Sequence, residues 1–316
     1  MRMRVKLMKL CVHMTRNFYA LLFLVAVIAL CGACGADETL IFESNVNPRP
    51  EFFEIRERLF ELEEPAGVSI VGLVAGDELA VPIVLVPGSG RSAMQFLDFI
   101  PLLVEAGFWT VALSPRGVEG SQGPLDELTL HHYAADIAGV IERLGVGPVH
   151  VLGYGEGNRI VRCLAADRGD LVRSIILLGA GGQFPGEREA LEALGRLGEP
   201  GRSQEERRED LQTALFAPAS DASVWLDLPL FPEIQESQDA AGRITPREEW
   251  LTAGNAPTLV VQGRYDRIAP PANGRWLREH LGDRVQLVEL ANSGHALIPE
   301  QPAEIVEAIR DFTGSL

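Results

Sequence analysis

The sequence predicts an α/β fold in which a mostly parallel sheet is covered by helices on both faces. From about residue 66, short apolar runs alternate with amphipathic helical stretches, and no internal repeat or low-complexity tract interrupts this alternation. The chain of 316 residues is 47% hydrophobic and 23% charged, a balance that is typical of a globular protein with one sizeable core. We therefore expect one domain over 66–316, with one insertion.

The spacing of apolar residues predicts the strands and helices. Short apolar runs indicate strands, and apolar residues that recur about every 3.6 residues indicate helices. The apolar runs predict strands at 68–74, 82–86, 109–114, 149–153, 172–178, 257–263 and 285–290. The amphipathic stretches predict helices at 94–105, 130–144, 158–167, 272–281 and 303–312. Between about 183 and 254 the strand pattern stops, and prolines separate helical stretches at 187–197, 204–215 and 247–252. This segment is predicted to be a helical lid.

The first 33 residues predict an export signal. Five basic residues lie within 1–17, where there is no acidic residue, and an apolar run follows at 18–30. As a helix this run would span about 20 Å, less than the ~30 Å hydrocarbon core, so a cleaved signal is favoured over a transmembrane anchor. Met14 begins a second plausible signal, so either methionine is a candidate start.

Cys34 ends a segment that resembles a bacterial lipobox, with Leu30, Gly32 and Ala33 before it and Cys31 as a departure from the pattern. The resemblance implies that a lipid is attached to Cys34 and anchors the protein in the bacterial envelope, on the periplasmic side of the outer membrane. The alternative is a plainly cleaved signal. Residues 34–65 are acidic and are expected to form either a tether or an N-terminal helix.

Composition argues against nucleic-acid binding and a structural metal. Lys and Arg total 28 against 44 Asp and Glu, and no basic cluster follows residue 17, so contacts with phosphates are not expected. The four cysteines, at positions 11, 31, 34 and 163, lack the paired spacing of zinc sites and are too few for a disulfide framework. We expect no metal and no cofactor, and a buried, unreactive thiol at Cys163.

Candidate functional residues follow three of the predicted strand ends. The sequence VPGSG occupies 86–90, GYGEG occupies 153–157, and Asp266 and His295 follow the last two strands. In this order the pieces resemble the α/β-hydrolase superfamily over about 66–316. The stretch SPRGVEGS at 114–121 adds to the resemblance, because it is similar to the D-x-R-G-x-G-x-S loop of that family.

The resemblance implies catalytic roles for several residues. It also indicates that the nucleophilic serine oxygen of the family is absent from this chain. Gly155 stands where the family has the serine nucleophile of its G-x-S-x-G turn, and His295 and Asp266 match the base and the acid. The backbone N–H groups of Ser89 and Glu156 would form the oxyanion hole. Glycine tolerates the positive φ of such a turn but has no nucleophilic atom, so no acyl-enzyme can form there.

Three functional hypotheses remain open. In the first, the protein is a degenerate hydrolase that binds a small hydrophobic or ester-like molecule under the lid. In the second, it is an enzyme in which His295 and Asp266 activate water or deprotonate a substrate without a covalent intermediate. In the third, it is an envelope protein whose surface binds a protein partner, and the pocket plays no part.

Overall fold

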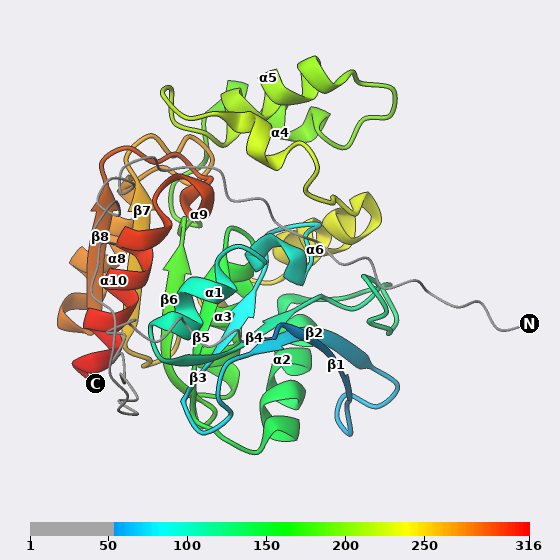
Figure 1. Ribbon diagram of the computed structural model, residues 1–316, viewed down its shortest axis with the longest axis vertical. Helices are drawn as coiled ribbons and strands as arrows, with labels where there is room; N and C mark the ends of the chain where they lie inside the picture. Colours follow the sequence, from blue (N-terminus) through cyan, green and yellow to red (C-terminus); the bar gives the residue numbers. More distant parts are fainter. Residues whose placement is uncertain (1–53) are drawn as a thin grey trace, which may run out of the picture. The chain divides into compact units, whose positions relative to one another are not determined.

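The computed structural model describes residues 54–316. The predicted signal peptide, Cys34 and most of the acidic segment lie outside these residues. One eight-stranded sheet has the order β1-β2-β4-β3-β5-β6-β7-β8 (Figure 1). Strand β2 is antiparallel to both of its neighbours, and every other pair is parallel. The strands are β1 Arg56–Glu61, β2 Ser69–Ala75, β3 Val81–Val86, β4 Phe108–Leu113, β5 Val149–Tyr154, β6 Val172–Leu178, β7 Thr258–Gly263 and β8 Val285–Leu290.

The α/β prediction is confirmed, and each predicted strand is present to within one residue at either end. Strand β1 was not predicted, and it corrects the expectation that residues up to 65 form a tether or a helix. It lies at the sheet edge and pairs with β2 through its backbone, while Phe60 is its only buried residue. Because a single buried residue gives no alternating pattern, the charged composition of β1 concealed it.

Helices cover both faces of the sheet. The predicted helix at 94–105 is two elements, because Pro101 lies in the first turn of a new helix, a position that proline tolerates. Two short turns near the C-terminus, η3 Gly282–Arg284 and α9 Leu297–Glu300, were not predicted. The covering elements are η1 Ala93–Phe96, α1 Ile100–Glu105, α2 Leu130–Leu144, α3 Gly157–Asp167, α8 Ala272–Leu281 and α10 Pro302–Gly314.

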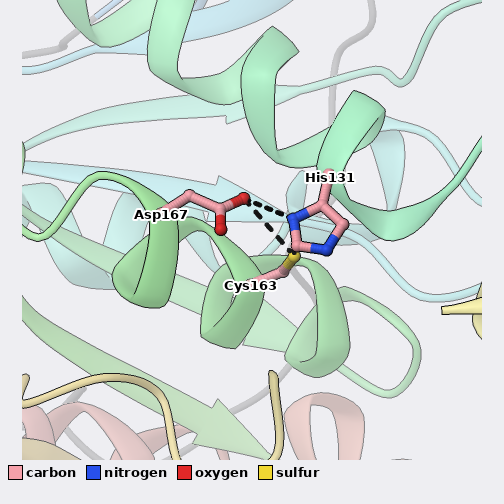
Figure 2. A group of neighbouring side chains, drawn as sticks. All are labelled: His131, Cys163 and Asp167. Atoms are coloured by element: carbon pink, nitrogen blue, oxygen red, sulfur yellow. Dashed lines mark hydrogen bonds and ion pairs between the residues drawn. The ribbon is translucent and has the colours of Figure 1, made fainter. Parts of the chain in front are cut away.

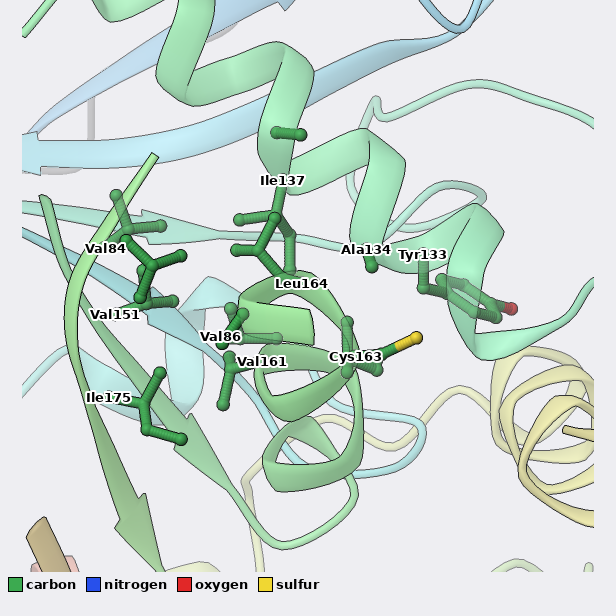
Figure 3. Close-up of a cluster of buried hydrophobic side chains, with 14 of the residues drawn as sticks. Val84, Val86, Tyr133, Ala134, Ile137, Val151, Val161, Cys163, Leu164 and Ile175 are labelled. Carbon is green, nitrogen blue, oxygen red and sulfur yellow. The ribbon is translucent and has the colours of Figure 1, made fainter. Parts of the chain in front are cut away.

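Two hydrophobic clusters occupy the two faces of the sheet. In one of them, Val84, Val151 and Ile175 from three neighbouring strands pack against Ile137 of α2 and Leu164 of α3 (Figure 3). Strands β4, β5 and β7 are buried at every position, as expected for parallel strands covered on both faces. This packing fixes the strand ends from which the candidate site is built.

Between β6 and β7 the chain forms a helical insertion, whose helices α4 and α5 lie beyond the arrowheads of β6 and β7 in Figure 1. One of its helices, α6, is not among the predicted helices, because its single proline, Pro232, stands in the first turn and begins the helix instead of breaking it. Among residues 54–316, no helix is both long and apolar enough to cross a membrane. The insertion consists of α4 Arg188–Arg196, α5 Gln204–Ala214, η2 Ala222–Trp225, α6 Pro232–Ile244 and α7 Arg247–Trp250.

Candidate functional site

Gly155 forms the sharp turn between β5 and α3. Its φ is +54°, and its N–H donates to the carbonyl oxygen of Leu178 at 3.1 Å. The glycines on either side are required by close backbone contacts. A Cβ at Gly153 would lie 2.5 Å from the Gly157 oxygen, and a Cβ at Gly157 would lie 2.5 Å from the Val86 oxygen. The three alternate glycines therefore let β5, α3 and the end of β3 approach closely.

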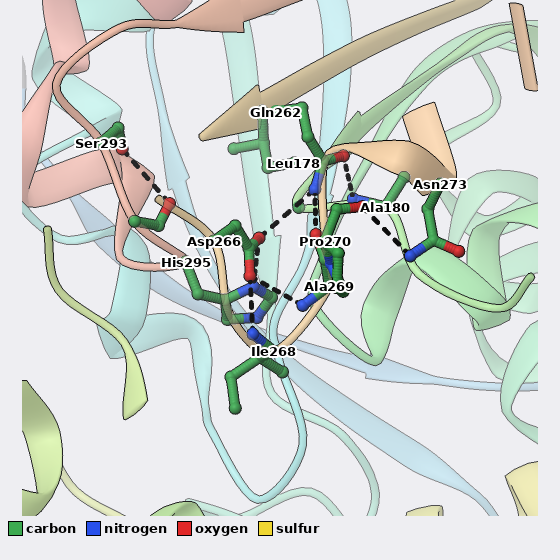
Figure 4. Close-up of polar contacts among 12 residues, drawn as sticks. Leu178, Ala180, Gln262, Asp266, Ile268, Ala269, Pro270, Asn273, Ser293 and His295 are labelled. Atoms are coloured by element: carbon green, nitrogen blue, oxygen red, sulfur yellow. Dashed lines mark hydrogen bonds and ion pairs between the residues drawn. The ribbon is translucent and has the colours of Figure 1, made fainter. Parts of the chain in front are cut away.

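His295 and Asp266 lie in direct contact (Figure 4). The distance from His295 Nδ1 to Asp266 Oδ2 is 2.8 Å, and Asp266 is 3% exposed. The other carboxylate oxygen, Oδ1, accepts the backbone N–H groups of Ile268 at 3.0 Å and Ala269 at 2.7 Å. These bonds hold the carboxylate in position to accept Nδ1–H, which leaves Nε2 of His295 as the basic nitrogen.

Nε2 of His295 faces the turn at Gly155. A Cβ built on Gly155 would lie 3.2 Å from Nε2, so a side chain at this position would meet the imidazole. On its other side the ring packs against Gly179, where a Cβ would lie 2.9 Å from Nδ1. The hydroxyl of Tyr154 donates to the carbonyl oxygen of His295 at 2.6 Å and fixes the loop that carries the ring.

Gly179 is a site residue that the sequence analysis missed. It directly follows β6, has a φ of +67°, and leaves the room that the imidazole occupies. A glycine after a central strand was the available signal, and the lack of a chemical group made it easy to overlook.

Ser89 and Glu156, whose backbone N–H groups the family resemblance assigns to the oxyanion hole, line the same cavity as His295. Neither N–H has an acceptor among residues 54–316, whereas the N–H groups of Gly88 and Gly90 donate to the side chains of Gln95 and Gln238, both at 2.8 Å. The loop after β3 is thus fixed by its two glycines, and the Ser89 N–H remains available to a ligand.

The cavity has a volume of about 700 Å³ and lies between the strand ends and the insertion. Gly155 and His295 form part of its floor, and leucines of α4 together with Trp225 of η2 contribute apolar surface. Polar groups from α6, including Asp239 and Arg243, line it as well. A space of this size accommodates a small organic molecule with an apolar part and a few polar groups.

Burial raises the pKa of two carboxyl groups that line the cavity, those of Glu156 and Asp239. Burial raises the pKa of Glu156 to about 7, although Arg159 lies 3.1 Å from its carboxylate and opposes the shift. Burial also raises the pKa of Asp239, whose Oδ1 accepts the Ser89 hydroxyl at 3.1 Å. Near neutral pH Glu156 is therefore only partly ionised, which weakens its repulsion of an oxyanion at the adjacent N–H groups.

The residues expected to act together do come together. His295 and Asp266 are in contact, Gly155 lies opposite Nε2 of His295, and Ser89 and Glu156 line the same cavity. The arrangement can bind a carbonyl compound and take a proton at Nε2, but it offers no hydroxyl or thiol at position 155.

Comparison with known proteins identifies a fold family and several esterases and hydrolases that are similar to this chain. The family profile described as "alpha/beta hydrolase fold" matches residues 81–302. A pimeloyl-[acyl-carrier protein] methyl ester esterase of Neisseria meningitidis is 29% identical over 246 residues, covering 73% of this chain and 92% of that protein. Rhodomycin D methylesterase of Streptomyces peucetius is 26% identical over 270 residues, covering 70% and 87%. The structure of 2-hydroxy-6-oxo-6-phenylhexa-2,4-dienoate hydrolase from Rhodococcus superposes with a TM-score of 0.67 at 21% identity, covering 83% and 99%.

Proposed function

Because the chain belongs to the α/β hydrolase fold family, we propose that it binds a small ester or acyl compound and forms no acyl-enzyme. The observation that carries this proposal is Gly155, which occupies the turn facing Nε2 of His295 and has no atom that can attack a carbonyl carbon. The curated relatives named above are esterases of methyl esters, which supports an ester as the ligand class. The apolar leucines of the insertion fit an acyl or alkyl part.

The experiment combines a covalent probe with a binding measurement. The protein is incubated with a fluorophosphonate and with a p-nitrophenyl ester, and its intact mass is followed. We expect no added mass, and we expect methyl esters of increasing chain length to raise the melting temperature. A stoichiometric adduct on any residue of the cavity would show that the protein does have a nucleophile and would refute the proposal.

A second candidate function rests on the His295–Asp266 contact. Asp266 holds Nδ1 of His295 at 2.8 Å, and Nε2 faces the cavity, which is the geometry of a general base. In this function Nε2 takes a proton from water while the oxygen attacks the ester carbonyl. The N–H groups of Ser89 and Glu156 stabilise the oxyanion, and the alcohol leaves with the proton.

His295→Ala separates the two functions. If water is activated by the dyad, ester hydrolysis by the wild type falls to the uncatalysed rate in His295→Ala, while ester binding is retained. Equal rates in the two proteins would exclude the dyad as a base. They would leave the binding function as the account of the site.

We also propose that the protein is exported and held in the bacterial envelope by a lipid on Cys34. Its support is the order of basic residues, apolar run and small residues before Cys34 in the sequence. A single acyl chain binds membranes only marginally, so the diacylglycerol of a lipoprotein is the physically adequate anchor. Labelled palmitate should enter the wild type but not Cys34→Ser, and label in both proteins would contradict the proposal.

A further inference from the structure

A second cluster of polar side chains lies where α2, α3 and α7 meet. His131 comes from α2, Cys163 and Asp167 from α3, and Glu249 from α7. Figure 2 shows the imidazole, the thiol and the Asp167 carboxylate converging on one point. None of these four side chains belongs to the lining of the cavity described above.

Three different donor atoms are close to one another in this cluster. Nδ1 of His131 lies 2.6 Å from Asp167 Oδ2 and 3.2 Å from Cys163 Sγ, and Sγ lies 3.7 Å from the same Oδ2. Tetrahedral Zn²⁺, with bonds of about 2.0 Å to N and O and 2.3 Å to S, needs ligand atoms about 3.3 to 3.6 Å apart. To reach this geometry the distance between Nδ1 and Oδ2 must widen by less than about 1 Å, and the distances from Sγ to Nδ1 and to Oδ2 must change by a few tenths of an ångström.

We propose that His131 Nδ1, Cys163 Sγ and Asp167 Oδ2 form a binding site for a divalent cation of the Zn²⁺ class. Thiolate, imidazole and carboxylate are the donors that Zn²⁺ takes in proteins. The His131 and Asp167 side chains are 36% and 37% exposed, so the fourth position faces solvent. The side chains that must shift are therefore on the accessible side of the cluster.

Glu249 supplies the outer contact that a metal-bound histidine needs. Its Oε2 lies 2.8 Å from Nε2 of His131, so the carboxylate accepts Nε2–H and leaves Nδ1 for the cation. A carboxylate in this position fixes the orientation of the ring and raises the basicity of the ligating nitrogen. In the metal-free protein Asp167 Oδ2 contacts both Nδ1 of His131 and the Cys163 thiol, so the carboxylate already holds the three donor atoms together.

The bound cation would connect the body to the insertion. It would bridge α2 to α3, the helix that starts just after Gly155, and through Glu249 it would also position α7. Burial raises the pKa of Cys163, so the metal-free thiol is a poor nucleophile, and cation binding replaces its proton. Cysteine spacing did not indicate this site because its ligands come from two helices and include only one cysteine.

Cobalt titration tests the site through its thiolate. The full chain is prepared in detergent with Cys11, Cys31 and Cys34 replaced by serine, which leaves Cys163 as its one thiol. One equivalent of Co²⁺ should produce a thiolate-to-cobalt charge-transfer absorption that Zn²⁺ abolishes by competition, and Zn²⁺ should raise the melting temperature. Cys163→Ser in this background should lose the absorption.

The His131 and Asp167 side chains are partly exposed, so the protein should still fold when either is replaced. A loss of Zn²⁺ binding in such a variant then reports on the site itself. Asp167→Asn and His131→Ala should each weaken Zn²⁺ binding by tenfold or more, and Glu249→Gln should weaken it by about tenfold. His280→Ala, which changes a surface histidine of α8, should bind as the background does. Absence of a Cys163-dependent absorption, or unchanged Zn²⁺ affinity in both Asp167→Asn and His131→Ala, would overturn the proposal.

Discussion

Gly155→Ser is the change that tests the proposed site most directly. A Cβ at this position would lie 3.2 Å from Nε2 of His295, which brings a serine hydroxyl into the region where the imidazole can accept its proton. The contact is slightly tight, and a few tenths of an ångström of ring movement relieves it. The variant should therefore gain the first step of ester hydrolysis, which is attack by Oγ on the carbonyl carbon.

The Gly155→Ser substitution should lower stability only slightly and raise esterase activity strongly. The φ of +54° suits glycine, and a residue with a Cβ there costs about 1 to 2 kcal/mol in the free energy of unfolding. In a serine protease, loss of the nucleophile alone lowers kcat by about 10⁶. Restoring it in a site whose other groups are already placed should raise kcat/KM for a short p-nitrophenyl ester by on the order of 10²-fold or more.

Gly155→Ala is the matched control, because it carries the same Cβ and backbone strain without the hydroxyl. Both variants should be destabilised equally in urea denaturation, and only the serine variant should hydrolyse the ester and gain mass from a fluorophosphonate. A folded serine variant without added activity would mean that the oxyanion hole or the base is not competent. Equal activity in the alanine variant would refute the role assigned to Oγ.

Three further changes test other parts of the site and its support. Asp266→Asn in the Gly155→Ser background should return esterase activity to the Gly155→Ala level, because the amide no longer holds His295 in the required tautomer. The pKa of Glu156 is raised to about 7 in the folded protein, so its ionisation destabilises the fold as pH rises from about 4.5 to 7. Urea denaturation should accordingly show that Glu156→Gln gains up to about 3 kcal/mol over the wild type at pH 8 and little at pH 4. Asp136→Ala should lower the free energy of unfolding by about 3 to 5 kcal/mol in urea, because it leaves the buried guanidinium of Arg116 without its partner.

Periodicity predicted the buried centre of the sheet because fully covered strands are continuous apolar runs. The runs at 149–153 and 257–263 are such strands, and the residues that follow them carry the candidate site. The edge strand β1 was not predictable in this way, since only Phe60 of its residues is buried. Helix α6 was missed because a proline can begin a helix as well as end one.

The sequence likewise predicted some residues of the candidate site and not others. Gly155, Asp266 and His295 were found because their order along the chain matches a known pattern of strand ends. Gly179 was missed because its contribution is room for the imidazole, which no residue pattern indicates. The cluster around His131 was missed because its ligands come from two helices, and only the packing of α2 on α3 brings them together.

The position of His295 does not depend on the side chain at position 155. Asp266 holds Nδ1, the Tyr154 hydroxyl holds the backbone carbonyl, and Gly179 supports one face of the ring. Each of these contacts comes from a group other than residue 155, so a glycine there leaves the base in place. A crystal structure of Gly155→Ser should accordingly show the imidazole within about 0.5 Å of its present position, the tolerance of a working catalytic group. A larger displacement would mean that residue 155 itself helps to set the base, and activity would then require second-site changes.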